Sequence, residues 1–208
     1  SPANSAVECV DVPGLYALIG PEAEGFANWS DANDLATDVG SASGPFPDAP
    51  LSIYGPGEES GTYDTFVEFA IEDLAEERGA GDFTRADYSS SANDNFIIEG
   101  IEGSETSLGW VGYAFYKAEQ DRLKAIAIDT GDGCVMPTDE TIAGGEYGFS
   151  RSLYIYVNTD KAAENPALAA YVDLYLSDAG LATVADAGYV DLPADRIAAT
   201  QSAWAGAL

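Results

Sequence analysis

The clearest pattern of apolar and polar positions lies between residues 62 and 78. Apolar residues recur there every three or four positions, and acidic residues take the opposite face; the apolar set is Tyr63, Phe66, Val67, Ala70, Ile71 and Leu74. This period predicts an amphipathic helix that begins at Thr62 and ends at the run Gly79-Ala80-Gly81.

Shorter patterns predict further helices. Residues 12–19 follow Asp11, a good N-cap residue, and carry Pro13 in their first turn. Other predicted helices lie at 96–101, 138–143, 166–176, 180–187 and in a final stretch that ends at Trp204.

Alternation of side chains predicts strands between these helices. It is cleanest at 152–158, where Leu153, Ile155 and Val157 alternate with two tyrosines. Further strands are predicted at 51–54, 123–128 and 189–190. Because strands and helices alternate along the chain, the sequence predicts an α/β fold.

The composition favours an ordered protein with an acidic surface. The chain has 208 residues, of which 46% are hydrophobic, and it carries 36 acidic and 8 basic residues for a net charge of −28. It is long enough for one large domain or two small ones. Nucleic acid is not an expected partner, because phosphate-backbone binding needs clustered Lys and Arg. We interpret the acidity as solubility in a saline exterior.

The sequence contains no histidine and two cysteines, Cys9 and Cys134. Zinc sites and Ser-His or Cys-His catalytic pairs are therefore not expected, and neither is an enzyme, a metal or a cofactor. Acidic pairs arise by chance among 36 acids. Cys9 and Cys134 either form a disulfide, if the protein is exported, or remain two buried thiols; we favour the disulfide.

The segment Ser60-Gly61-Thr62 is the leading candidate for a binding site. It joins the predicted strand at 51–54 to the predicted helix. Two hydroxyls, free backbone N–H groups and the positive end of the helix dipole would meet there and would suit an oxyanion. The alternative is that Ser60 or Thr62 only caps its own helix, which is a common use of these residues.

Arg85 is the second candidate, since it is one of five arginines. A guanidinium binds an oxyanion through two parallel hydrogen bonds, and Asp87 or Asp94 would hold it in place. The alternative is an arginine that only pairs with one of the many acids.

Several segments, in order along nearly the whole chain, resemble the phosphate-binding proteins of phosphate ABC transporters. They are Phe26–Ser30, Leu51–Phe66, Arg85–Asn95, Leu108–Tyr116, Ser150–Val157, Tyr171–Asp178 and Gly188–Pro193. The resemblance implies a periplasmic-binding-protein-like (type II) fold with one complete lobe and the C-terminal part of the other. The second lobe would occupy residues 1–150, and residues 151–208 would form the hinge strand and the return into the first lobe.

The same resemblance implies a function. The protein would be an extracytoplasmic monomer, periplasmic or lipid-anchored at the cell surface, that captures inorganic phosphate and delivers it to an ABC-transporter permease. Ser60, Gly61 and Thr62 would bind the ion. Many members place an arginine where this chain has Pro56, so Arg85 would replace it. Much of the N-terminal lobe would come from a segment missing here.

Two alternatives to phosphate capture stay open at this point. The site would suit another oxyanion such as sulfate, since the two anions differ chiefly in protonation. The chain would otherwise be a surface interaction or structural module without ligand binding, a reading favoured by Pro56 in place of the arginine.

Overall fold

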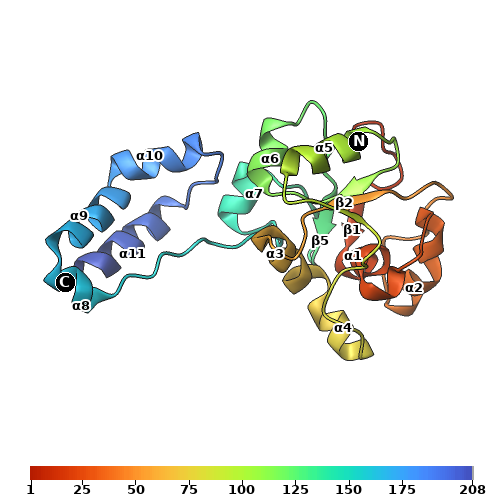
Figure 1. Ribbon diagram of the computed structural model, residues 1–208, viewed down its shortest axis with the longest axis horizontal. Helices are drawn as coiled ribbons and strands as arrows, with labels where there is room; N and C mark the ends of the chain where they lie inside the picture. The colour runs from red at the N-terminus through yellow and green to blue at the C-terminus, as the bar shows by residue number, and fades with distance from the viewer. Residues whose placement is uncertain (208) are drawn as a thin grey trace. The chain divides into compact units, whose positions relative to one another are not determined.

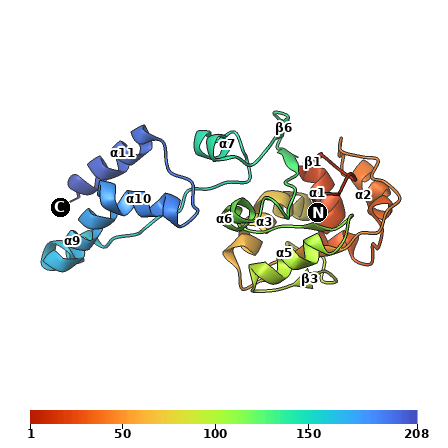
Figure 2. The same ribbon diagram turned by 90° about the horizontal axis from the view of Figure 1, so that it is seen from above.

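The computed structural model describes residues 1–207, which divide into two compact units. Unit 1 comprises residues 1–137 and 147–149, and unit 2 comprises residues 138–146 and those from 150 onward. Figures 1 and 2 show the helices and strands of both units.

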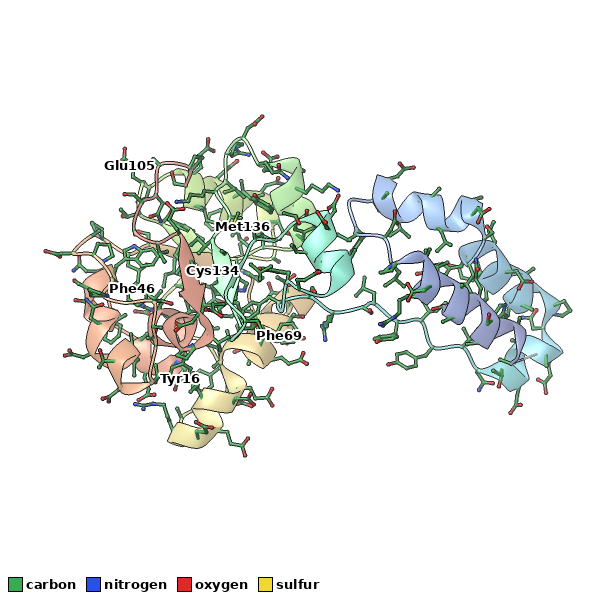
Figure 3. All side chains as sticks on the ribbon, turned by 180° about the vertical axis from the view of Figure 1, so that it is seen from behind. Tyr16, Phe46, Phe69, Glu105, Cys134 and Met136 are labelled. Carbon is green, nitrogen blue, oxygen red and sulfur yellow. A yellow bond between two sulfur atoms is a disulfide. The ribbon has the colours of Figure 1, made fainter. Side chains whose placement is uncertain are left out.

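One sheet of unit 1 has the strand order β1-β5-β6. β1 (Cys9–Asp11) runs parallel to β5 (Ala127–Asp129), and β6 (Cys134–Val135) pairs with β5 in the antiparallel sense. Cys9 and Cys134 form a disulfide, which confirms the predicted pairing. Cys134 is labelled in Figure 3. The bond closes a chain separation of 125 residues and ties the start of unit 1 to its end.

The other sheet of unit 1 has the order β3-β2-β4, and both pairings are parallel. Its strands are short: β2 is Ile53–Gly55, β3 is Ser89–Ser90 and β4 is Leu108–Gly109. The central strand β2 confirms the strand predicted at 51–54, shifted by one to two residues.

Unit 1 contains the helices predicted at 12–19 and 96–101, and the segment predicted as one helix at 62–78. The α-helices are α1 (Val12–Ile19), α2 (Asn33–Asp38), α3 (Gly61–Ala70), α4 (Glu72–Arg78), α5 (Asp94–Glu102) and α6 (Tyr113–Ala118), and the 3₁₀ turns are η1 (Pro21–Ala23) and η2 (Trp29–Ala32). Asp11 caps α1 as predicted, because its carboxylate accepts from the Gly14 N–H at 2.9 Å. The single helix predicted at 62–78 is two helices, broken at Ile71, and the break leaves Ile71 and Ala75 both buried.

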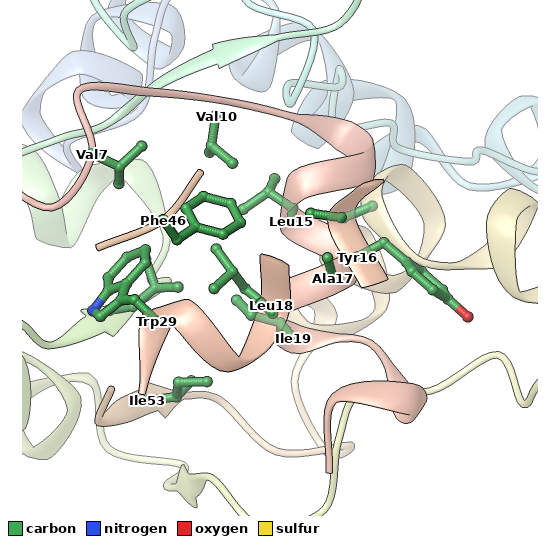
Figure 4. Packing of buried hydrophobic residues seen from close by; sticks show 14 of the residues in the cluster. Val7, Val10, Leu15, Tyr16, Ala17, Leu18, Ile19, Trp29, Phe46 and Ile53 are labelled. Carbon is green, nitrogen blue, oxygen red and sulfur yellow. The ribbon is translucent and has the colours of Figure 1, made fainter. Parts of the chain in front are cut away.

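The core of unit 1 gathers around α1. Tyr16, Leu18, Ile19 and Trp29 are almost fully buried, and Phe46 lies against Trp29 with ring centroids 6.0 Å apart (Figure 4). A second, smaller cluster joins three isoleucines of α5 to Leu123. Burial of large apolar side chains at about 25 cal/mol per Å² makes this core the main source of stability of unit 1.

Unit 2 is helical: it contains α7 (Asp139–Gly144), α8 (Thr159–Glu164), α9 (Pro166–Tyr175), α10 (Asp178–Asp186) and α11 (Ala194–Ala205). The helices predicted at 138–143, 166–176, 180–187 and at the C-terminal end are confirmed. Within the unit, the Trp204 indole N–H donates to Asp173 at 2.7 Å and joins α11 to α9.

Two predicted strands of unit 2 are wrong for the described structure. Residues 152–158 and 189–190 have no regular secondary structure, and Figure 1 draws the first of these segments as a plain coil. A strand is stabilised by hydrogen bonds to a neighbouring strand. The backbone of residues 152–157 has no such partner within residues 1–207, so the alternating pattern alone does not make a strand.

None of the helices formed by residues 1–207 combines the length and the apolar character that crossing a lipid bilayer requires.

Candidate functional site

The three parallel strands of the β3-β2-β4 sheet bring their carboxyl ends to one edge. β2 is the central strand, with Tyr54 opposite Ser89 and Ile53 opposite Leu108. The connections that leave this edge begin at Pro56, Ser91 and Trp110. In open α/β sheets, ligands bind outside the carboxyl ends of the strands. This edge is therefore a candidate ligand site.

Ser60, Gly61 and Thr62 start α3 at this edge. Ser60 has extended backbone angles (φ −109°, ψ 130°), and its Oγ accepts from the Thr62 N–H at 3.2 Å. Ser60 is therefore the N-cap of α3, the role that the alternative interpretation of this segment expects. The cap uses a lone pair of Ser60 and leaves its hydroxyl proton free to donate.

Several hydrogen-bond donors at the start of α3 are uncommitted. Within residues 1–207, no acceptor is found for the hydroxyl protons of Ser60 and Thr62 or for the N–H groups of Gly61 and Tyr63. A Cβ at Gly61 would meet nothing within 4 Å, so the backbone is open to an approaching group. Together with the helix dipole, these donors make an oxyanion-binding arrangement.

A hollow of about 240 Å³ lies beside Ser60. The β2–α3 and β3–α5 connections line it, through Pro56, Glu59, Ser60, Ser91, Ala92 and Asp94; we call it the Ser60 hollow. Two of these six side chains are carboxylates and none is cationic. An anion there would be held by hydrogen-bond donors, next to carboxylates that act as acceptors.

Two hydrogen bonds tie a lining residue of the Ser60 hollow to the strand region of the neighbouring connection. The Tyr88 hydroxyl donates to the Pro56 carbonyl oxygen at 2.6 Å, and the Ser91 N–H donates to the Gly55 carbonyl oxygen at 3.1 Å. The Tyr88 ring lies 5.1 Å from that of Trp110. Burial raises the pKa of Tyr88 to about 12, so its hydroxyl remains a donor at neutral pH.

Arg85 is 4% exposed and is held by protein acceptors. Its guanidinium donates to both carboxylate oxygens of Asp87, at 2.6 and 2.8 Å, to the Phe26 carbonyl oxygen at 2.7 Å and to the Leu18 carbonyl oxygen at 3.4 Å. The hydrogen bonds from Arg85 lower the pKa of Asp87 to about 2. Four of the five N–H donors of this guanidinium are therefore used inside the fold.

The predicted site residues fall into two groups. Ser60 and Asp94 line the same hollow, with Gly61 and Thr62 adjacent to Ser60, whereas Arg85 and Asp87 form an ion pair and are absent from its lining. Asp94 does not support Arg85; no ion pair joins them in the described residues.

Sequence reasoning missed Ser91 and Ala92 as lining residues. A signal for them was present, because Asn93 precedes an isoleucine stripe with helical spacing. Asn93 indeed caps α5 through its side chain, and the stripe is Ile97, Ile98 and Ile101. A second helix therefore begins at the hollow, although its first residue is acidic.

A second hollow of unit 1 has fewer polar groups available to bind a ligand. It lies beside Asp11 and Asp129. The Asp11 carboxylate already accepts from the Gly14 and Ala42 N–H groups and from the Ser41 and Ser43 hydroxyls. The described part of the chain also holds no group of three or more acidic or cysteine side chains arranged for a metal ion.

The family model "PBP superfamily domain" matches residues 17–179. The chain belongs to this superfamily. Among curated relatives, the protein SphX of Synechocystis is 42% identical over 71% of this chain and 42% of its own length. The phosphate-binding protein PstS of Staphylococcus saprophyticus is 32% identical over 71% of this chain and 43% of its own length.

Two solved structures share the fold of this chain. A possible phosphate-binding protein from Planctomyces limnophilus matches with a TM-score of 0.80 and 30% identity, covering all of this chain and 67% of that one. PstS of Borrelia burgdorferi matches with a TM-score of 0.61 at 20% identity, over 90% of this chain and 65% of that one. At this identity the similarity establishes a shared fold and nothing further. These matches confirm the predicted α/β, periplasmic-binding-protein-like fold. The chain spans about half the length of the curated relatives that it matches.

Proposed function

We propose that the chain is part of an extracytoplasmic solute-binding protein that captures inorganic phosphate for an ABC transporter. The observation that carries this proposal is the set of uncommitted donors at the start of α3, at the carboxyl edge of a parallel sheet. The similarity of the chain to proteins named as phosphate-binding supports phosphate as the anion.

The proposed binding mode uses Ser60, Gly61 and Thr62. The two hydroxyls donate to phosphate oxygens, and the N–H groups of Gly61 and Tyr63 complete the contact. Gly61 leaves room for the close approach of the ion. The net charge of −28 does not prevent binding in a saline medium, because screening there acts over about 3 Å at 1 M salt and local donors decide.

Glu59 and Asp94 support phosphate over sulfate. Both carboxylates line the Ser60 hollow. A carboxylate repels a fully ionised anion but accepts a hydrogen bond from a protonated one. Hydrogen phosphate carries such a proton at neutral pH and sulfate does not. The proposal therefore assigns selectivity to these two acids.

We propose that Arg85 contributes less to anion binding than the sequence predicts. One of its N–H donors remains for a ligand, and its main part is to hold the segment that leads to Tyr88 and Ser91.

We propose that the complete protein contains a further lobe segment in addition to this chain. A further N-terminal lobe segment would close over the anion, and a permease would receive it, since the chain spans about half the length of its relatives. We propose residues 1–150 as one lobe and 151–208 as the hinge strand and the return into the other. The Cys9–Cys134 disulfide supports an extracytoplasmic location, because disulfides persist in oxidising compartments.

Titration calorimetry of the phosphate-stripped protein with phosphate and with sulfate tests the proposal. Phosphate should release or absorb heat with a defined stoichiometry, and sulfate should bind more weakly. No heat with either anion would favour a module that does not bind a ligand, for which the commitment of Arg85 to protein acceptors is the supporting observation. Equal affinities would favour a general oxyanion receptor.

Ser60→Ala separates binding from helix capping. We expect it to weaken phosphate binding by about tenfold or more, the cost of a hydrogen bond to a charged group. The matched control is Ser177→Ala, since Ser177 caps α10 by accepting from the Gly180 N–H at 3.2 Å, the same length as the Ser60 cap. Ser177→Ala also removes a hydrogen bond to the Leu174 carbonyl oxygen, so it should cost at least as much stability as Ser60→Ala, and only Ser60→Ala should lose affinity.

A further inference from the structure

Ser91 lies directly after the strand that neighbours β2. The register pairs Gly55 with Ser90, so Pro56 and Ser91 are the first residues after two adjacent parallel strands. Adjacent strands lie about 4.8 Å apart. The Ser60 hollow is lined from both sides, by Ser60 of the β2–α3 connection and by Ser91 of the β3–α5 connection. One small anion in this hollow is therefore within reach of both connections.

The Ser91 hydroxyl has a proton available for such an anion. Its Oγ accepts from the Asn93 N–H at 3.0 Å. No acceptor for the hydroxyl proton is found within residues 1–207, and neither carboxylate of the hollow takes it there. Ser60 has the same arrangement, since its Oγ also accepts a backbone N–H and its proton is uncommitted. A serine hydroxyl offers one donor and two lone pairs, so each of these bonds leaves the donor for a ligand.

The backbone around Ser91 holds this hydroxyl in place. The Ser91 N–H donates to the Gly55 carbonyl oxygen at 3.1 Å, which ties the residue to the end of β2. Asn93, the partner of the Ser91 hydroxyl, is in turn fixed as the N-cap of α5. A donor that is ordered before the ligand arrives loses less conformational freedom on binding. Ser91 is therefore prepared to donate without rearrangement of its connection.

We propose that the Ser91 hydroxyl is a further hydrogen-bond donor to the anion bound at the start of α3. The inference rests on the proposed function, because it adds a ligand from the β3–α5 connection to the same site. The anion is then held from two connections of the sheet. Such a neutral donor suits a hollow whose six lining side chains include no cation, beside an Arg85 whose guanidinium is committed to Asp87 and Phe26.

Ser91→Ala tests the inference by calorimetry on the phosphate-stripped protein. We expect phosphate affinity to fall by about tenfold or more, the effect of losing a hydrogen bond to a charged group. Ser104→Ala is the matched control, because the Ser104 Oγ also accepts from the N–H two residues ahead, that of Thr106 at 3.4 Å, and does not line the hollow. It should keep the parent affinity. Unchanged affinity in Ser91→Ala, or an equal loss in both variants, would overturn the inference.

Ser91→Asp removes the donor and keeps the local turn. An aspartate accepts the N–H two residues ahead as serine does, so the Asn93 N–H keeps a partner. Its carboxylate cannot donate at neutral pH and repels the anion, so phosphate affinity should fall by about 100-fold or more. Ser90→Asp is the control: it puts the same charge on the preceding exposed residue, which does not line the hollow, and should cost much less. Equal losses would indicate a general effect of charge and would overturn the inference.

Sulfate titration separates a direct contact of Ser91 from an effect on Asp94. A hydroxyl donates to either anion, so Ser91→Ala should weaken phosphate and sulfate binding by similar factors. If Ser91 acted only by positioning Asp94, Ser91→Ala would change the ratio of the two dissociation constants, as Asp94→Asn should. A changed ratio would overturn the assignment of Ser91 as a donor.

The parent protein and Ser60→Ala separate this inference from the proposed function. Phosphate binding that weakens in Ser60→Ala and not in Ser91→Ala would contradict the inference alone. A parent protein that does not bind phosphate would contradict the proposed function, and the inference would fall with it.

Discussion

The hydroxyl of Tyr88 donates a 2.6 Å hydrogen bond to the carbonyl oxygen of Pro56. This bond joins the residue directly before β3 to the first residue of the β2–α3 connection, and Pro56 lines the Ser60 hollow. The backbone of Pro56 therefore links the segment that precedes α3 to the segment that leads into β3.

Tyr88→Phe should loosen the hollow. We expect a loss of about 1 kcal/mol in the free energy of unfolding, the usual worth of one internal hydrogen bond, and weaker phosphate binding. Urea unfolding and calorimetry measure the two effects. Tyr16→Phe is the control, because it removes a hydroxyl that donates to Glu22 at 2.7 Å and does not line the hollow. If both variants keep full phosphate affinity, the Tyr88–Pro56 bond is only structural.

The ion pair between Arg85 and Asp87 predicts a loss of stability in acid. The pKa of Asp87 is about 2 in the folded protein, below its ordinary value of 3.8. Its contribution is present above the ordinary pKa and disappears as the pH falls through about 2. The difference in unfolding free energy between the parent protein and Asp87→Asn should therefore shrink between pH 4 and pH 2.

Asp82→Asn serves as the control for this pH series, since Asp82 is exposed and takes no partner in the described residues. It should show no comparable change with pH. A difference for Asp87→Asn that stays constant across the acid range would mean that the ion pair is not the source of its effect.

Asp94→Asn should reduce the preference for phosphate over sulfate. The amide no longer repels a fully ionised anion, so sulfate should gain affinity relative to phosphate by about tenfold, or ~1.4 kcal/mol. Competition calorimetry gives the ratio of the two dissociation constants. Glu58→Gln removes a neighbouring charge that does not line the Ser60 hollow and should leave the ratio nearly unchanged. The same shift in both variants would indicate a general effect of charge.

Reduction of Cys9–Cys134 should destabilise unit 1. The bond closes a separation of 125 residues, and the loop-entropy model gives about 3–5 kcal/mol for such a closure. Urea unfolding with and without reductant measures the loss. Because the sequence has only these two cysteines, the Cys9→Ser/Cys134→Ser protein is the control and should not respond to reductant. Equal stability in both redox states would contradict the predicted contribution.

The helices were predictable from the sequence because their signals are local. Tyr63, Phe66 and Ala70 share one face through helical spacing, and Asp11 caps α1 from a position directly before it. The strand predicted at 152–158 was wrong because strand formation depends on distant partners. Its alternation is as clear as that of any strand, but a strand also needs hydrogen-bond partners, and the described residues do not supply them.

The candidate site was predictable only in part. The start of α3 was readable from Ser60-Gly61-Thr62 because a strand, a turn and a helix follow one another there. The commitment of Arg85 was not readable, since its acceptors at Leu18 and Phe26 lie 67 and 59 residues away in the sequence. The position of Ser91 was not predictable either. It follows β3, a strand of only two serines, which has no apolar alternation to reveal it.

The central claim is that the uncommitted donors at the start of α3 bind phosphate, and Thr62→Val tests it most directly. The Thr62 hydroxyl has no partner within residues 1–207, so valine, which has nearly the same shape, should leave the free energy of unfolding almost unchanged. Thr65→Val in the same helix is the control, since its hydroxyl donates to the Gly61 carbonyl oxygen at 2.7 Å. Calorimetry should show phosphate affinity reduced by about tenfold or more for Thr62→Val and retained for Thr65→Val. Full phosphate affinity in Thr62→Val would contradict the account.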